Sequence, residues 1–158
     1  MAIGFGSDHW GLDLKNQLFA HFTELGQDPI DFGTYTSDPV DYPEIASSVA
    51  LAVRDGIIRN GVLICRTGLG MAIAANKVSG IFAAAVHNLA TARAAAASNA
   101  TQIISLGSAF ISFHHASRLI HAWLETPFKG GDSARKVGMI RLLESQSGKL
   151  ELLEQVRT

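Results

Sequence analysis

Residues 61–77 read GVLICRTGLGMAIAANK, and this stretch decides the fold class. The run GVLIC at 61–65 has the length and composition of a buried strand. Two glycines follow within TGLG, and the small, mostly apolar residues of 70–80 then favour a helix. A fully apolar strand that passes through a glycine turn into a helix is typical of a parallel sheet covered on both faces.

The same alternation extends in both directions along the chain. Short β-rich runs predict strands at 2–6, 29–33, 61–65, 81–86 and 101–107. Helices are predicted at 10–26, 44–56, 70–80, 89–99, 112–125 and 133–156. Residues 1–158 contain no internal repeat or low-complexity linker. We therefore expect one α/β domain with a five-stranded parallel sheet and right-handed crossovers.

Composition limits the classes of function. Charged residues make up 17% of the 158 residues and the formal net charge is −1, which argues against nucleic acid or an anionic membrane as the main partner. Hydrophobic residues make up 47%, enough for an ordered core and for some surface buried in an oligomer. A single cysteine, with no secretory signal pattern and no run of membrane-spanning length, predicts a cytoplasmic protein that binds a small molecule.

The predicted sheet gives the polar segments a common location. In such sheets ligands bind beyond the carboxyl ends of the strands, where the strand order reverses. Segments 7–10, 65–70, 87–88 and 107–109 each follow a predicted strand, so we expect them on one edge. Asp8 and His9 could hydrogen-bond sugar hydroxyls or a phosphate there, and His9 could exchange protons. Ser7 or Asp8 could equally cap the helix that follows, and the two roles are compatible.

The chain's only cysteine lies where this edge meets the glycine turn. Cys65 precedes a helix N-terminus and is next to Arg66, an electropositive setting that favours a thiolate able to act as base or nucleophile. The alternative is a small hydrophobic residue that ends a buried strand. The N–H groups of TGLG at 67–70 favour an anion, although the sequence matches neither a dinucleotide fingerprint nor a P-loop.

Histidines and tryptophans outside this edge receive structural interpretations. His114 and His121 share a helical face, but no carboxylate or cysteine joins them at ligand spacing, so no metal site is expected. Trp10 and Trp123 are expected to be core or interface anchors rather than ligand platforms.

Six segments form a pattern that covers nearly the whole chain. They are GSDHWG at 6–11, DYPEIASSVALAV at 41–53, GVLICRTGLGMAIAANKVSGI at 61–81, SNATQIISLGS at 98–108, AWLETPFKGG at 122–131 and ARKV at 134–137. Together they resemble the ribose-5-phosphate isomerase type B and galactose-6-phosphate isomerase family. The resemblance implies a Rossmann-like three-layer α/β/α sandwich. It also implies a homodimer or tetramer in which the C-terminal helix packs on the partner and active sites are shared between subunits.

The family's reaction is aldose–ketose isomerisation of a sugar phosphate through an enediolate, without metal or cofactor. Carried onto this chain, Cys65 would be the base that moves the proton between C1 and C2, and Thr67 would help shuttle protons between the two oxygens. The backbone from Gly68 to Gly70, with Asn99, would stabilise the developing negative charge. The residues that would position the substrate are Asp8, His9 and Tyr42.

Several positions depart from the family pattern. Ser98 stands where many members have a histidine assigned to opening the sugar ring. Ala109 and Asp132 stand where basic residues usually hold the phosphate, and Asp132 would repel a dianion. Arg66 stands where the family more often has glycine. The candidate phosphate ligands are therefore Arg66, Arg135 and Lys136.

The missing histidine points to a short substrate. A tetrose phosphorylated at C4 has no free hydroxyl that could close a five-membered ring, so it needs no ring-opening residue. The sequence therefore favours a tetrose phosphate pair such as erythrulose 4-phosphate and erythrose 4-phosphate. His87 is the counter-argument, because at the end of the fourth strand it could replace the imidazole missing at Ser98. Its alternative role is to cap the next helix.

Two other functions stay open. Within the enzyme class, the alternative is a pentose- or hexose-phosphate isomerase, with ribose 5-phosphate and ribulose 5-phosphate as the parent pair. From a different class, the chain could be a non-catalytic sugar-phosphate-binding subunit of a hetero-oligomer. The retained Cys65 and Thr67 argue against this second alternative.

Overall fold

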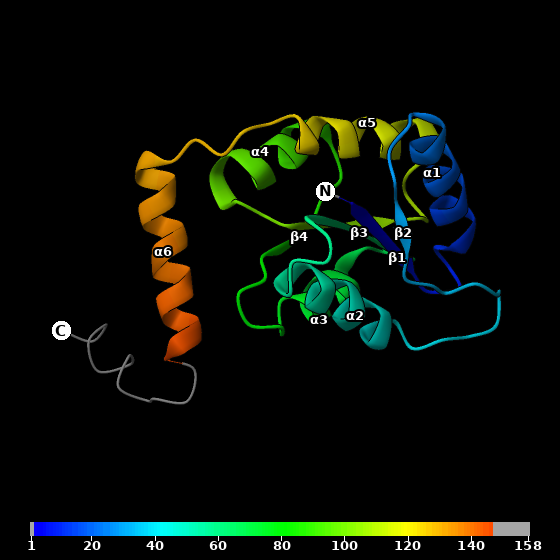
Figure 1. The fold of residues 1–158 in the computed structure, drawn as a ribbon, viewed down its shortest axis with the longest axis horizontal. Coiled ribbons are helices and arrows are strands. Elements are labelled where there is room, and N and C mark those ends of the chain that lie inside the picture. The colour runs from blue at the N-terminus through cyan, green and yellow to red at the C-terminus, as the bar shows by residue number, and fades with distance from the viewer. Residues whose placement is uncertain (1, 147–158) are drawn as a thin grey trace.

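A five-stranded parallel sheet lies between two layers of helices in the computed structural model, which describes residues 2–146 (Figure 1). The strands lie in the order β2-β1-β3-β5-β4. Their bounds are β1 Ile3–Ser7, β2 Ile30–Asp31, β3 Asn60–Cys65, β4 Ala83–Ala85 and β5 Ile103–Gly107. Every strand pair is parallel, so the predicted α/β fold with five parallel strands is confirmed.

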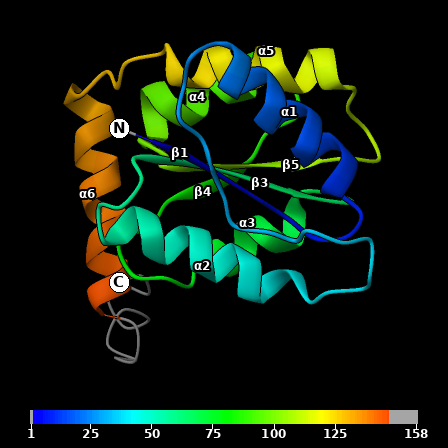
Figure 2. The same cartoon turned by 45° about the vertical axis from the view of Figure 1, so that its right-hand side comes forward.

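The helices divide between the two faces of the sheet. One face carries α1 (Leu12–Glu24), α4 (Leu89–Asn99) and α5 (Phe113–Leu124), and the other carries α2 (Tyr42–Arg54) and α3 (Leu69–Ala75), as Figure 2 shows. A sixth helix, α6 (Gly131–Ser145), stands beside this sandwich. No helix within residues 2–146 is long and apolar enough to cross a bilayer.

The apolar run of β3 is explained by burial on both faces. Val62 and Ile64 belong to the core cluster formed with α1, α4 and α5, whereas Leu63 and Cys65 belong to the cluster formed with α2 and α3. The residues alternate because successive side chains of a strand point to opposite faces. A central parallel strand therefore needs apolar side chains at every position.

Two predicted elements differ in extent from the structure. The strand predicted at 29–33 is shortened to β2, because the chain bends after Asp31 while still bonding to β1: the Phe32 N–H donates to the Phe5 carbonyl at 2.8 Å and the Ser7 N–H donates to the Gly33 carbonyl at 2.6 Å. The last helix begins at Gly131 and ends at Ser145. Residues 147–156, predicted as its continuation, lie outside the described residues.

The strand order reverses between β1 and the central strand β3. From β1 the chain passes to β2 at one border, and from β3 it passes to β4 at the other. The segments that follow β1, β3 and β5 meet at this point, because the Asp8 N–H donates to the Ile64 carbonyl at 3.2 Å and the Ser108 N–H donates to the Cys65 carbonyl at 2.9 Å. The carboxyl edge therefore has the arrangement predicted for a ligand site.

Candidate functional site

A pocket of about 390 Å³ opens at the carboxyl edge beside the β1–β3 reversal. Segments from three parts of the chain form it: the turn after β1, the end of the loop before α2, and the glycine turn after β3. Its lining residues are Asp8, His9, Trp10, Val40, Asp41, Tyr42, Cys65, Arg66, Thr67 and Gly70. Seven predicted site residues are therefore together: Asp8, His9, Tyr42, Cys65, Arg66, Thr67 and Gly70.

Asp8 and His9 occupy a turn that is held by backbone groups. Asp8 is buried, and its Oδ1 accepts the N–H of Trp10 at 2.9 Å and that of Gly11 at 3.1 Å. The N-cap of α1 is Gly11, so the prediction that Ser7 or Asp8 caps this helix is wrong by one turn. The N–H of Val40 donates to His9 Nδ1 at 3.3 Å, which places the proton of a neutral His9 imidazole on Nε2.

Cys65 is buried in the core and also lines the pocket, so its position is compatible with both interpretations, and its reactivity stays a prediction. The residue is 5% exposed and packs in the core cluster under α2 and α3, yet it also lines the pocket. Its Sγ accepts a hydrogen bond from the Gly68 N–H at 3.2 Å, a contact that stabilises negative charge on sulfur. Gly68 has φ of 78°, and a Cβ there would lie 2.9 Å from the Leu106 carbonyl carbon, so the turn requires glycine.

The N–H groups of the glycine turn are directed at the chain's own side chains. The Gly68 N–H bonds to Cys65 Sγ, and the Leu69 N–H donates to Thr67 Oγ1 at 3.3 Å. These two N–H groups, which the sequence predicts for a bound anion, are therefore bonded to the thiol and the hydroxyl that precede α3.

Arg66 lies over an aromatic ring at the mouth of the pocket. Its Cζ is 4.8 Å from the centroid of the Trp10 ring, within cation–π range. Trp10 is 56% exposed in the single chain, so it is not a core residue and its alternative role as an interface anchor stays a prediction, whereas Trp123 is buried. Arg66 also neighbours Ala109, whose N–H donates to the Arg66 carbonyl at 3.1 Å. Among the ion pairs of residues 2–146, none joins Arg66 to a carboxylate.

Tyr42 lines the pocket from the start of α2. It is the first residue of α2, and its ring packs against the backbone of Gly70 in α3. A Cβ on Gly70 would lie only 2.6 Å from Tyr42 Cζ, so the ring occupies the space that a side chain would need. Val40 and Asp41 line the pocket next to Tyr42 and were not predicted, although they belong to the same turn-rich loop.

His87 lies apart from this pocket. It follows β4, and β5 separates β4 from β3 in the sheet, so about 10 Å of sheet separates its position from that of Cys65. The His87 N–H donates to Thr91 Oγ1 at 3.2 Å, and the His87 carbonyl lies 3.2 Å from His115 Nε2. These contacts tie the residue to the start of α4 and do not bring it to Cys65. The N-cap of α4 is Asn88, so the prediction that His87 caps this helix is wrong by one residue.

Asn99, Arg135 and Lys136 lie at the opposite edge of the sheet. Asn99 is the last residue of α4, which leads into the amino end of β5, and α6 contacts α4. The C-terminal part of α6 reaches the chain before β4, where the Glu144 carboxylate accepts the Gly80 N–H at 2.9 Å. The length of β3, about 17 Å, therefore separates these residues from Cys65 within one chain.

The described part of the chain has no cluster of metal-ligating side chains. Among residues 2–146, His, Cys, Asp and Glu side chains form no group of three or more that could hold a metal ion. The arrangement at the pocket is instead a thiol and a hydroxyl held by backbone N–H groups, with an imidazole, a phenol and a guanidinium around the opening. Such a set can move protons and hold a polar, anionic ligand.

The chain matches known sequences over most of its length. A family model described as Ribose/Galactose Isomerase matches residues 3–140. Ribose-5-phosphate isomerase B of Escherichia coli is 40% identical over 144 residues, covering 91% of this chain and 97% of that protein. D-erythrulose-4-phosphate isomerase of Pectobacterium atrosepticum is 40% identical over 150 residues, covering 92% of this chain and 97% of that protein.

Solved structures agree with the sequence matches. A ribose-5-phosphate isomerase B of Clostridium thermocellum superposes with a TM-score of 0.91 at 40% identity, covering 94% of this chain and 100% of that one. The Mycoplasma genitalium enzyme with bound ribulose-5-phosphate superposes with a TM-score of 0.87 at 33% identity, covering 92% of this chain and 97% of that one. The chain therefore belongs to the ribose/galactose isomerase family, a family of sugar-phosphate isomerases.

Proposed function

We propose that the chain is a cytoplasmic aldose–ketose isomerase of a small sugar phosphate, with Cys65 as the base. The observation that carries this proposal is the position of the Cys65 thiol. It lines the carboxyl-edge pocket, its sulfur accepts the Gly68 N–H at 3.2 Å, and Thr67 is adjacent to it in the same turn. A base in this position can take a proton from carbon and return it to the neighbouring carbon.

The proposed reaction begins with an open-chain sugar bound at the pocket. The Cys65 thiolate takes the C2 proton of the aldose, and the electron pair forms the C1–C2 double bond of an enediolate. Thr67 passes a proton between O2 and O1, and Cys65 then returns its proton to C1 to give the ketose. Proton and electron counts balance without an external oxidant. Asp8, His9 and Tyr42 would hold the hydroxyls of the substrate during these steps.

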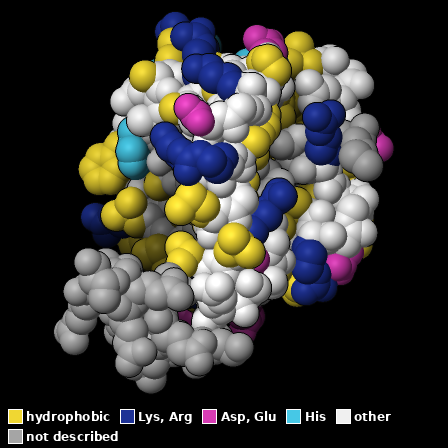
Figure 3. All heavy atoms as spheres, turned by 90° about the vertical axis from the view of Figure 1, so that its left-hand side faces the viewer, with side chains coloured by type: hydrophobic (Ala, Val, Ile, Leu, Met, Phe, Trp, Pro, Cys, Tyr) yellow, Lys and Arg dark blue, Asp and Glu magenta, His cyan; other side chains and the backbone are white. Residues whose placement is uncertain are grey.

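We propose that a second copy of the chain completes the site. Asn99, Arg135 and Lys136 lie at the amino edge, and their distance from Cys65 within one chain excludes a shared pocket there. Helix α6 presents Met139, Ile140 and Leu142 as exposed hydrophobic residues, and Figure 3 shows hydrophobic side chains gathered on this face. In the proposed dimer this face is buried, and the partner's Asn99 and basic residues lie at the carboxyl edge.

Arg66 is the proposed phosphate ligand of the carboxyl edge. Its guanidinium lies over Trp10, and its backbone carbonyl accepts the N–H of Ala109, the position at which the family pattern has a basic residue. Guanidinium groups bind phosphate through paired N–H donors. Arg135 and Lys136 of the partner subunit would supply the remaining positive charge.

The proposed substrate is a tetrose 4-phosphate. Ser98 lies next to Asn99 near the end of α4, where the family pattern has a ring-opening histidine, and His87 is tied to the start of α4 away from the pocket. An open-chain tetrose phosphate needs neither imidazole. The relatives named for ribose 5-phosphate and for erythrulose 4-phosphate are both 40% identical to this chain, so identity favours neither substrate.

A substrate panel tests the proposal directly. The purified chain is assayed with four-, five- and six-carbon aldose and ketose phosphates, and kcat/KM is compared across the panel. We expect the highest value for the erythrose 4-phosphate and erythrulose 4-phosphate pair. A higher value for ribose 5-phosphate would establish the pentose alternative instead. Binding without turnover of any sugar phosphate would indicate a non-catalytic subunit of a hetero-oligomer.

A further inference from the structure

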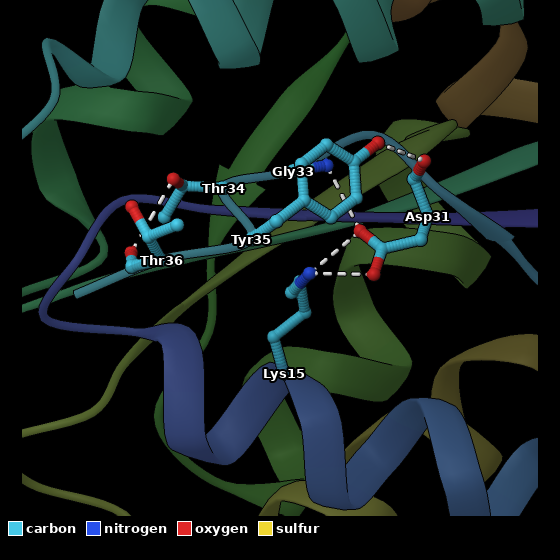
Figure 4. Close-up of polar contacts among 6 residues, drawn as sticks. All are labelled: Lys15, Asp31, Gly33, Thr34, Tyr35 and Thr36. Atoms are coloured by element: carbon cyan, nitrogen blue, oxygen red, sulfur yellow. Dashed lines mark hydrogen bonds and ion pairs between the residues drawn. The ribbon is translucent and has the colours of Figure 1, made fainter. Parts of the chain in front are cut away.

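A buried lysine lies outside the set of residues that line the pocket. Lys15 is in the first turns of α1, and its side chain is 1% exposed. Its Nζ lies 2.6 Å from both carboxylate oxygens of Asp31 on β2, as Figure 4 shows. Lysine is almost never fully buried unless it is paired, because removing its charge from water is costly. The ion pair with Asp31 therefore compensates for the burial of the Lys15 charge.

Asp31 joins the lysine to the loop at 33–41. The Asp31 Oδ1 that contacts Lys15 also accepts the Gly33 N–H at 2.8 Å. The Tyr35 hydroxyl donates to the Asp31 carbonyl at 3.0 Å, and the Tyr35 ring lies over Lys15 Nζ with its centroid 5.2 Å away (Figure 4). The Lys15 ammonium group thus lies where helix α1, strand β2 and the start of the loop, Gly33 to Tyr35, come together.

Both ends of this loop reach the pocket. At its start, the Gly33 carbonyl accepts the Ser7 N–H and the Thr34 N–H donates to the Ser7 carbonyl, each at 2.6 Å, directly before Asp8. At its end, the Val40 N–H donates to His9 Nδ1 at 3.3 Å, and Tyr42 follows two residues later. A shift at the start of the loop would therefore move the Val40 N–H, which orients the His9 imidazole.

We propose that the Lys15–Asp31 pair, covered by Tyr35, is a positioning unit that fixes the loop at 33–41 and thereby sets the orientation of His9. None of Lys15, Asp31 and Tyr35 lines the pocket, so the unit acts through the loop and not on the substrate. Its kinetic consequence rests on the proposed isomerase function. Because His9 and Tyr42 would bind substrate whereas Cys65 stands on β3, loss of the unit raises KM more than it lowers kcat.

The test removes the charge of Lys15 while keeping an unbranched side chain. In Lys15→Met we expect KM for the preferred sugar phosphate to rise about tenfold while kcat changes less than about threefold. We also expect the ¹⁵N signals of the His9 ring to move from a single Nε2–H tautomer toward a mixture. The matched control is Ile120→Val, a buried change in the same helical layer that has no contact with the loop. The control should leave both measurements at wild-type values.

Tyr35 supplies a second pair of variants, because it is 71% exposed and its truncation does not threaten the core. Tyr35→Ala should reproduce the shift in the His9 signals and the rise in KM, and Tyr35→Phe, which loses only the bond to the Asp31 carbonyl, should give a smaller effect. Wild-type His9 signals and KM in Lys15→Met or in Tyr35→Ala would overturn the proposal. So would equal changes in Ile120→Val. The His9 signals need no turnover, so they test the positioning unit even if the isomerase function fails.

Discussion

A methyl group on Gly70 should damage substrate binding while leaving the fold intact. Gly70 lies in the first turn of α3, and the ring of Tyr42 fills the space beside its Cα. In Gly70→Ala the new Cβ would lie 2.6 Å from Tyr42 Cζ and 2.8 Å from Tyr42 Cε2. Ordinary van der Waals contact begins near 3.4 Å, so the ring must move by at least 0.8 Å.

Two opposing contributions to the free energy of unfolding compete in this variant. Replacing glycine by alanine within a helix stabilises it by about 1 kcal/mol. Displacing the Tyr42 ring costs packing, but the residue is 39% exposed and its ring can swing toward solvent, so we expect a net stability change within about 1 kcal/mol. Misplacing a substrate-binding group by about 1 Å can cost up to about 100-fold in rate. We therefore expect kcat/KM to fall about 10- to 100-fold, or about 1.4 to 2.7 kcal/mol.

Thermal unfolding and steady-state kinetics on the same preparations separate the two effects. For a chain of this size the melting temperature should change by less than about 4 °C. The matched control is Gly138→Ala in α6, where a Cβ has no neighbour within 4 Å in the single chain, so the helical gain should appear without any displacement of Tyr42. Wild-type kcat/KM in Gly70→Ala would show that Tyr42 does not position the substrate. A loss of kcat/KM accompanied by unfolding would contradict the expected balance of energies.

Three further variants test the proposed roles of single residues. Cys65→Ala should abolish isomerisation while circular dichroism and oligomeric state stay unchanged, and activity near the wild-type level would identify another base. Arg66→Ala should raise KM for sugar phosphates about tenfold with little effect on kcat, and an unchanged KM would exclude it as a phosphate ligand. Ser98→His should raise kcat/KM on cyclic pentose phosphates, and no gain would leave the ring-opening argument without support.

The sequence predicted the layers and the site edge because both depend on local patterns. The apolar run at 61–65 required burial on both faces, and the rule for parallel sheets then placed Asp8, Cys65 and Gly70 on one edge. The bounds of β2, the strand at one border of the sheet, were harder to predict than the layers. The strand predicted at 29–33 shortens because the loop that follows is held by Lys15 and by the backbone of β1, and these partners are distant in sequence.

Contacts that depend on tertiary packing were not accessible from the sequence. Trp10 follows Asp8 and His9, and nothing local indicates that Arg66 will cover its ring, because that contact needs β1 and β3 to be neighbours. The partner of the Gly68 N–H was also unpredictable, because the same glycine turn could have held a ligand anion instead of Cys65 Sγ. Local sequence patterns indicate which residue types lie at the site, whereas the contacts between them depend on which strands are neighbours in the sheet.

The two edges of the sheet divide the departures from the family pattern into two groups. Ser98 and Asp132 belong to the amino-edge set, which a second copy would contribute to the proposed site. Arg66 and Ala109 belong to the carboxyl edge, together with the proposed base. Phosphate binding in this chain would therefore depend less on residues of the partner subunit and more on Arg66 at the carboxyl edge, where the proposed base also lies. A phosphate held nearer the reacting carbons suits a shorter carbon chain, which is the same conclusion that Ser98 supports from the opposite edge.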